Sequence, residues 1–296
     1  MRKSLVVAKL PNAGLGNKMF VWAKALIYAK QKNCPFLTYG FSSVHIGPLL
    51  RKQKVKRFYL EQFKFSLNLL VLFQYLFKNL FSTRYHEPSF PAINDSKDGL
   101  FVFSKVPHWS DYFSTIRDHR NLIKKEFPNL LSQRVYNKIK EIPAPVIACH
   151  IRCGDFRILQ KNENFKDVGG VRTPLDYFVK TISTLRSIAG ETLPVTIFSD
   201  GYEDELNEVF ALEKVGLFSP QEDVVDMLVM SKAEYIITSA GSTFSEWAGF
   251  LSNAVLILHP DHIHTKIRME EDLFEGAIEA FKKYKNENGL KNNTAK

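Results

Sequence analysis

The chain has 296 residues, of which 45% are hydrophobic and 24% charged, so it is long enough for one large domain or two smaller ones. This composition excludes a disordered or collagen-like chain, and three cysteines are too few for a disulfide-rich secreted module. The net charge of +9 points to an anionic partner, such as nucleic acid, a membrane surface or a phosphorylated ligand.

The net charge is positive in the first half of the chain and negative in the second. Residues 1–145 contain 24 Lys and Arg against 8 Asp and Glu, whereas residues 146–296 contain 16 against 23. The sign changes at the Pro-Ala-Pro segment 143–145, which has the composition of a linker. We therefore predict an N-terminal domain over 1–143, a C-terminal domain over 144–285 and a disordered tail over 286–296.

No targeting signal is recognisable in the sequence. The apolar run before Lys9 is too short for a signal-peptide core, and polar residues interrupt the most apolar window, at 63–81, so a membrane span is not expected. The cysteines lack metal-ligand spacing, and His259, His262 and His264 lack the carboxylate or Cys spacing of a zinc site, so no metal site is predicted. These features predict a cytoplasmic protein.

The first predicted elements are a strand, a glycine loop, a helix and a second strand, which is how an α/β unit begins. Apolar periodicity defines the helix, and short apolar runs define the strands. The predictions for this half are a strand at 4–10, a helix at 18–32, a strand at 36–39, a basic cluster at 51–57, an apolar stretch at 58–81, irregular structure at 82–110, and helices at 111–127 and 130–141.

The second half alternates more regularly, and its four short apolar strands between helices predict a mostly parallel sheet. The first helix is expected to open with Thr173 as N-cap and Pro174 at its first position. The predicted strands are 146–150, 195–198, 235–238 and 254–258, and the predicted helices are 174–188, 203–210, 223–231, 245–251 and 271–285. The fold class is therefore α/β.

Polar clusters follow four of the predicted strands, and ligands of open α/β sheets bind at the carboxyl ends of strands. The first cluster contains Gly14, Gly16 and Asn17 at a helix start, which suits an anion, although a simple tight turn explains it equally well. The second contains Arg152, whose guanidinium suits phosphate, and Asp155; a structural Arg–Asp pair is the alternative.

The third cluster ends in Asp200, which could accept hydrogen bonds from a ribose or base, or could cap the next helix. The fourth is a hydroxyl-rich turn with Ser242 and Thr243, which could hold a diphosphate or form a capping box with Glu246. The sequence has no D-x-D triplet, which disfavours a transferase that relies on a carboxylate-held metal.

Jointly these motifs resemble those of the inverting α-1,2-fucosyltransferases. The segment NAGLGNKMFVWAKAL resembles the family's G-G-L-G-N-Q-M-F opening, and HIRCGDF resembles its H-x-R-R-G-D motif. IFSD and MSKAEYIITSAGSTFSEWAGFLS resemble its later blocks, and the order and spacing match from residue 10 to about 260. Lys18 and Cys153 stand where the family has Gln and a second Arg.

The resemblance implies a GT-B-like fold, in which two Rossmann-like domains enclose a donor cleft, with GDP-fucose as donor substrate and with no metal or other cofactor. It implies an acceptor-side domain over 1–143 and a GDP-sugar-binding domain over 144–285. By position, Arg152 would hold the β-phosphate of GDP, Asn17 with Gly14 and Gly16 would approach the sugar-phosphate, Asp200 would touch the nucleoside, and His150, Ser242 and Thr243 would complete the donor site. Asp155 is the candidate general base with Glu246 in reserve, and Arg157 is the candidate replacement for the missing arginine.

The implied acceptor is a galactose-containing oligosaccharide or a lipid-linked glycan, as in O-antigen biosynthesis. Another nucleotide sugar or an α-1,6 linkage is the alternative within the same class. A nucleic-acid-binding protein is disfavoured, because no zinc-finger, RRM or KH motif occurs and the second half is acidic. A module at the anionic inner face of a membrane, which would use the basic cluster at 51–57 and the apolar stretch after it, is compatible with the transferase. A core helix of the acceptor-side domain beside a solvated basic loop explains the same segment equally well.

Overall fold

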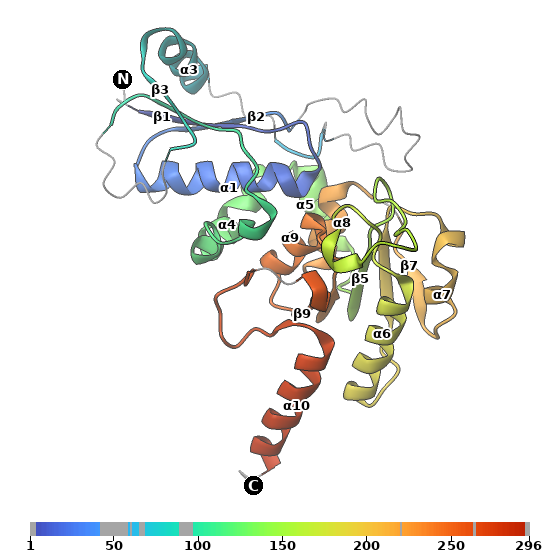
Figure 1. The fold of residues 1–296 in the computed structure, drawn as a ribbon. Coiled ribbons are helices and arrows are strands. Elements are labelled where there is room, and N and C mark those ends of the chain that lie inside the picture. The colour runs from blue at the N-terminus through green and yellow to red at the C-terminus, as the bar shows by residue number, and fades with distance from the viewer. Residues whose placement is uncertain are drawn as a thin grey trace. The chain divides into compact units, whose positions relative to one another are not determined.

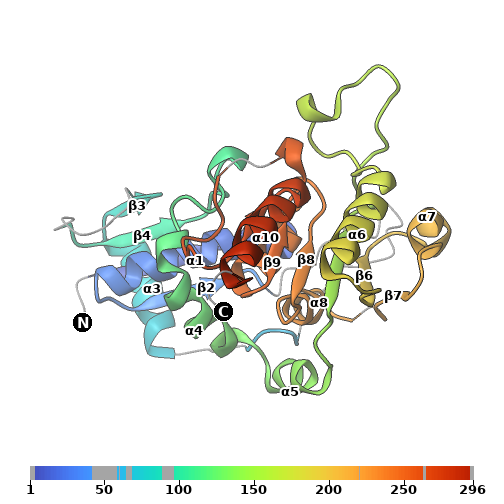
Figure 2. The same cartoon turned by 90° about the horizontal axis from the view of Figure 1, so that it is seen from below.

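The computed structural model describes residues 4–41, 59, 61–64, 69–88, 97–219, 221–262 and 265–293, so the basic cluster at 51–57 and His264 lie outside the described residues. The chain divides into two compact units inside α5 (Gln133–Glu141), between Lys138 and Ile139, close to the linker at 143–145. Each unit has its own parallel sheet (Figures 1 and 2). In the part of the chain that the structure describes, no helix has the length and apolarity needed to cross a bilayer.

The first unit contains a four-stranded parallel sheet in the order β2-β1-β4-β3. One face is covered by α1 (Leu15–Gln31) and the other by α3 (Leu69–Phe81) (Figure 1). The core lies between α1 and the two central strands, which are almost wholly buried. The strands are β1 (Leu5–Lys9), β2 (Phe36–Tyr39), β3 (Arg84–His86) and β4 (Leu100–Phe103).

Two predictions for this unit are wrong. The segment 82–110 is not irregular, because β3 and the central strand β4 lie within it; β4 is only four residues long, but all four are apolar and buried. The segment 111–127 is not one helix, because local bonds such as the one from Ser114 Oγ to the Asp111 carbonyl (2.7 Å) compete with the helical pattern. It contains parts of two 3-10 helices (Trp109–Asp111, Arg117–His119), then α4 (Arg120–Glu126) and the start of a third 3-10 helix (Phe127–Leu130).

The second unit contains a six-stranded sheet in the order β10-β9-β8-β5-β6-β7, and every pairing in it is parallel, as predicted. The edge strands β7 and β10 were not predicted, because runs of three and two residues carry no periodicity. The strands are β5 (Ile147–Ile151), β6 (Val195–Ser199), β7 (Val215–Leu217), β8 (Tyr235–Ile237), β9 (Val255–Ile257) and β10 (Glu275–Gly276).

Helices cover both faces of this sheet, and alternate residues of β5 point to opposite faces. Cys149 belongs to the core beneath α6 and α10, whereas the ring of His150 lies against Phe244 at the start of α9. The helices are α6 (Leu175–Ala189), α7 (Asn207–Phe210), α8 (Asp223–Met230), α9 (Thr243–Leu251) and α10 (Ile278–Asn293), with 3-10 helices at Phe165–Asp167, Glu203–Leu206 and Pro260–His262.

The N-cap of α6 and the bounds of α10 differ from the predictions, and the predicted helix 203–210 is a 3-10 helix (Glu203–Leu206) followed by α7. Pro174, and not Thr173, is the N-cap of α6, because Thr173 Oγ1 instead accepts the N–H of Ala240 at 3.0 Å. The helix α10 begins at Ile278, after β10, and runs to Asn293 through most of the predicted tail. Lys283 and Glu287 lie one turn apart in it, with a 3.8 Å ion pair that favours the helix.

Candidate functional site

Arg152 lies immediately after β5 and between two carboxylates. Its Nη1 donates to Oδ2 of Asp200, which follows β6, and its Nη2 donates to Oδ1 of Asp155. The two strands pair Ile151 with Ser199, so the residues that follow them meet at one edge of the sheet. The Arg152 side chain is 19% exposed and therefore fixed in position while still reached by solvent. A guanidinium held in this way suits a phosphate or diphosphate.

Asp200 is held more firmly than Asp155. Its Oδ1 accepts the backbone N–H of Cys153 at 2.8 Å, and its side chain is 12% exposed against 32% for Asp155. Gly154 leaves the room for this arrangement, because a Cβ there would lie 2.9 Å from Asp200 Cγ and closer still to Oδ2. In the described structure Asp200 therefore contacts Arg152 and the following backbone, and does not act as a helix cap.

Ser239 joins the carboxyl ends of β5 and β8. Its Oγ accepts the N–H of Arg152 at 2.8 Å and donates to the carbonyl oxygen of His150, also at 2.8 Å. The strand order reverses here, because β5 is followed in the chain by β6 on one side, whereas β8 lies on its other side. Such a reversal is where open parallel sheets bind ligands. Arg152 thus lies at the expected binding position of this sheet.

His150 is buried behind this edge, with 4% of its surface exposed. Its ring lies 5.3 Å from that of Phe244, and its Nδ1 has no hydrogen-bond partner within the described residues. Burial lowers the pKa of His150 to about 4, so the imidazole is neutral at neutral pH. This side chain can exchange a hydrogen bond with a ligand but offers it no positive charge.

Ser242 and Thr243 form the start of α9. Gly241 precedes them with φ of 63°, a conformation that favours glycine. Ser242 is the N-cap, but its buried side chain makes no capping bond, so it does not take part in the expected capping box. The first-turn N–H groups of a helix lack intrahelical acceptors, which makes this end suited to an anion. Burial raises the pKa of Glu246, in the same turn, to about 7.

Cys153, which stands where the resembling family has arginine, points into the protein and is 4% exposed. Its Sγ lies 3.9 Å from Ser199 Oγ, and a Cβ at Gly201 would come within 2.7 Å of that sulfur. Burial raises the pKa of the Cys153 thiol, against the opposing effects of Ser199 and of the nearby Arg172. The cysteine therefore belongs to the packing behind Arg152.

The other arginines near this edge are engaged with carboxylates. Arg157, the expected replacement for the missing arginine, makes two bonds to Glu163, at 2.5 and 2.6 Å. Arg172 donates to Glu205 at 2.6 Å and to the carbonyl oxygen of Phe156 at 3.0 Å.

Gly14, Gly16 and Asn17 lie at the start of α1, in the first unit. Gly14 is the N-cap, and the space beside it is open, because an added Cβ would meet no atom within 4 Å. The Oδ1 of Asn17 is buried and has no hydrogen-bond partner among the residues described. Lys18 is wholly buried and donates to the Gly40 carbonyl, and burial lowers its pKa to about 8. The asparagine thus offers an unused acceptor beside an open glycine turn.

The predicted site residues therefore form two groups, one in each unit. Arg152, Asp155 and Asp200 are in direct contact, while His150 lies against the start of α9 that Ser242 and Thr243 form. Gly14, Gly16 and Asn17 share the start of α1. The sequence reasoning missed Ser239, Thr173 and Gly154 as residues that shape the site. Ser239 was within reach, because it stands directly after a predicted strand in the same turn as Ser242.

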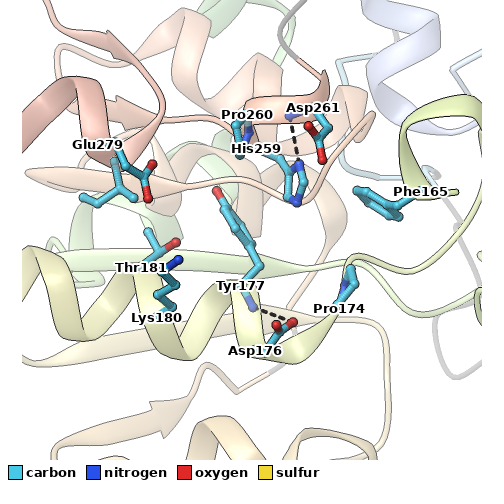
Figure 3. A pocket seen from close by; sticks show the side chains of 11 residues that line it. Phe165, Pro174, Asp176, Tyr177, Lys180, Thr181, His259, Pro260, Asp261 and Glu279 are labelled. Atoms are coloured by element: carbon cyan, nitrogen blue, oxygen red, sulfur yellow. Dashed lines mark hydrogen bonds between the residues drawn. The ribbon is translucent and has the colours of Figure 1, made fainter.

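A separate cavity of about 300 Å³ lies in the second unit, beside the first turns of α6 and α10 (Figure 3). The ring of Tyr177 extends into it, 4.5 Å from the ring of His259, and the ring of Phe165 lies 4.8 Å from His259. Asp176 and Glu279 supply carboxylates to its wall. None of the residues predicted for the donor site line this cavity.

Solved structures support a GT-B-like fold. The chain is similar to the fucosyltransferase NodZ from Bradyrhizobium, with 12% identity over 88% of this chain and 98% of that one and a TM-score of 0.55. It is also similar to NodZ alpha-1,6-fucosyltransferase soaked with GDP-fucose, with 11% identity over 85% and 94% of the two chains and a TM-score of 0.52. The predicted α/β, GT-B-like fold is confirmed.

The sequence itself identifies the family. The profile of glycosyl transferase family 11 matches residues 10–275, which is most of the chain. The chain therefore belongs to glycosyl transferase family 11, the fucosyltransferase family that its motifs resemble. No curated protein sequence matches this chain significantly.

Proposed function

We propose that the protein transfers fucose from GDP-fucose to a hydroxyl of a galactose-like sugar, with inversion, in an α-1,2 linkage and without a metal ion. Family membership supports glycosyl transfer, and the motifs around Gly14, Arg152 and Asp200 support this donor. The observation that carries the proposal is the guanidinium of Arg152, fixed at the point where the strand order reverses.

In the proposed reaction the acceptor oxygen attacks C1 of fucose while the bond from C1 to the diphosphate oxygen breaks, so the configuration at C1 inverts. Negative charge develops on the leaving GDP, and a fixed cation with backbone N–H groups stabilises it. Arg152 supplies the cation, and the first turn of α9, which begins at Thr243, supplies N–H groups, whereas the N–H of Ser242 donates to the Ser239 carbonyl at 3.3 Å. These groups take the place that a metal ion has in metal-dependent transferases.

The acceptor proton goes to a carboxylate, for which Asp155 is our candidate. It is the more exposed of the two partners of Arg152, so a diphosphate can displace it while Asp200 stays in place. Displacement frees its Oδ1 for the proton. Glu246 is the reserve candidate, because a pKa of about 7 lets it exchange a proton near neutrality.

The first unit contributes contacts to the sugar-phosphate in this proposal. Asn17 has a buried amide oxygen without a described partner, which would accept a hydrogen bond from a donor hydroxyl. Gly14 and Gly16 allow a close approach of the backbone. The acceptor that fits the resemblance is a galactose-containing oligosaccharide, free or linked to a lipid carrier.

The test is an assay of the purified protein with GDP-fucose against a glycan array, with and without EDTA. We expect metal-independent transfer to terminal galactose, and Arg152→Ala lowers the rate roughly 100–1,000-fold, as is typical for a lost oxyanion donor. Lys283→Ala, which removes an exposed cation of α10, serves as the matched control and keeps the wild-type rate. Transfer from another nucleotide sugar only, or a wild-type rate for Arg152→Ala, contradicts the proposal.

An α-1,6 linkage is the second candidate, and one observation favours it: the similar structure soaked with GDP-fucose is that of an α-1,6-fucosyltransferase. Methylation analysis of the product distinguishes the two linkages, because each leaves a different hydroxyl of the acceptor sugar protected from methylation.

A further inference from the structure

The helix α3 turns its apolar side away from the protein. The side facing the sheet carries the polar residues Gln74 and Lys78, 9% and 7% exposed, beside Val71 and Tyr75, which pack on the sheet. Helices of soluble proteins bury their apolar stripe and expose the polar side, so α3 is reversed. Its outward residues are 44–81% exposed, and all are large and apolar: Leu69, Leu70, Phe73, Leu76, Phe77, Leu80 and Phe81.

These seven residues, which we call the α3 face, form one continuous surface. Their spacing places them on one side of the helix, and the rings of Phe77 and Phe81 lie 5.0 Å apart. A helix of 13 residues is about 20 Å long, too short to cross a bilayer. An exposed apolar surface of this size indicates a docking site rather than chance exposure.

Positive charge borders the α3 face. From Leu69 to His86 the sequence contains Lys78 and Arg84 but no Asp or Glu. Arg84 donates to the Asn79 carbonyl, which fixes its guanidinium at the last turn of α3.

The acidic residue that follows this segment is already neutralised. Glu87 forms an ion pair with Lys24 at 3.0 Å and accepts backbone N–H groups of Ser104 and Lys105. The occupant of the α3 face therefore meets an apolar surface with a cationic border.

We propose that the α3 face binds the surface of a membrane that contains anionic lipids, with the helix lying in the plane of the interface. Such a surface offers acyl chains to the apolar residues and phosphate groups to Arg84. A second copy of the chain fits less well, because symmetric pairing of two α3 helices brings like charges together. The proposal goes beyond fucosyl transfer and does not depend on it.

The test is co-sedimentation of the full chain with vesicles of phosphatidylcholine alone or with 30% phosphatidylglycerol. We expect binding to the anionic vesicles at 50 mM NaCl, with a large loss at 500 mM. Phe73→Ser with Leu80→Ser lowers the partition coefficient at least about tenfold, because each exposed side chain contributes its free energy of transfer from water to the acyl chains. Both side chains are exposed, so the variant keeps its fold.

The matched control is Trp109→Ser with Met269→Ser, which removes two large apolar side chains, 52% and 50% exposed, elsewhere on the chain. This control binds vesicles as the wild type does. Equal binding by both double variants, or no binding of the wild type at low salt, overturns the proposal. Dimerisation in ultracentrifugation that Phe73→Ser with Leu80→Ser abolishes, without vesicle binding, assigns the α3 face to a second copy instead. Transfer to a soluble acceptor is measured alongside, and we expect it unchanged in both variants.

Discussion

The carboxylate of Asp200 bonds both the guanidinium of Arg152 and, at 2.8 Å, the backbone N–H of Cys153, so one side chain fixes a cation and the main chain beside it. We infer that Asp200 is a positioning residue for Arg152. Asp200→Asn keeps an acceptor for the N–H but loses the charge, and we expect kcat/KM to fall about tenfold, within the 0.5–3 kcal/mol typical of coupled neighbours.

A double-mutant cycle separates positioning from a direct role. If Asp200 acts through Arg152, Asp200→Asn costs little further activity in the Arg152→Ala background, because there is no guanidinium left to orient. The measurement is kcat/KM for GDP-fucose in the four proteins. Effects that simply multiply would show instead that Asp200 contacts the donor independently, as the sequence motif alone suggested.

Gly154 is expected to tolerate no side chain. A methyl group there lies 2.9 Å from Asp200 Cγ, so Gly154→Ala pushes the carboxylate off Arg152 and lowers kcat/KM with a stability loss of about 1–3 kcal/mol. Gly169→Ala is the control, because its Cβ meets no atom within 4 Å. Steady-state kinetics with urea unfolding measures both effects. Unchanged kinetics in Gly154→Ala would mean that the contact between Asp200 and Arg152 does not affect catalysis.

Restoring the family's second arginine should not improve donor binding. The Cys153 side chain is buried against Ser199 and Gly201, so Cys153→Arg overpacks this region and destabilises the fold by about 1–3 kcal/mol. We expect GDP affinity, measured by calorimetry, to stay equal or decrease, while Cys153→Ala keeps the wild-type affinity. Tighter GDP binding by a stable Cys153→Arg protein contradicts the packing described for this position.

Stability should decrease at acidic pH partly through His150. Its pKa is about 4 in the folded protein and near 6.5 when unfolded, so between these values the unfolded chain binds more protons. The contribution of His150 to the free energy of unfolding is complete above pH 6.5 and is lost as the pH falls toward 4. The loss at pH 5 is about 2 kcal/mol. Urea unfolding at pH 7 and pH 5 measures it, and His150→Gln loses less stability between the two. Equal losses in both proteins mean that His150 does not titrate as a buried neutral ring.

Much of this fold could be predicted from local sequence. Apolar runs predict strands such as 36–39 and 146–150, and apolar periodicity predicts the helix after Gly16. The structure contains all three within a few residues of the predicted bounds. The strand β4 could not be found in this way, because four apolar residues in a proline-containing stretch have no period and depend on β1 and β3 for their hydrogen bonds.

The site was predictable as a set of strand ends but not as a set of contacts. Arg152 and Asp200 were both chosen for following a strand, yet their bond depends on the pairing of Ile151 with Ser199, which no local pattern reveals. The Cys153 side chain points inward because Gly201, 48 residues farther along the chain, leaves room for its sulfur. No local sequence pattern predicts this direction.

The two carboxylates on Arg152 have a consequence for turnover. Because the guanidinium is already paired in the protein described here, the proposed donor GDP-fucose would enter by exchanging one anion for another. Affinity for the diphosphate is lower than a bare arginine would give, but the same carboxylate competes with GDP once the sugar has left. Asp155 would thereby hasten release of the spent nucleotide, a step that commonly limits the rate of transferases with tightly held products.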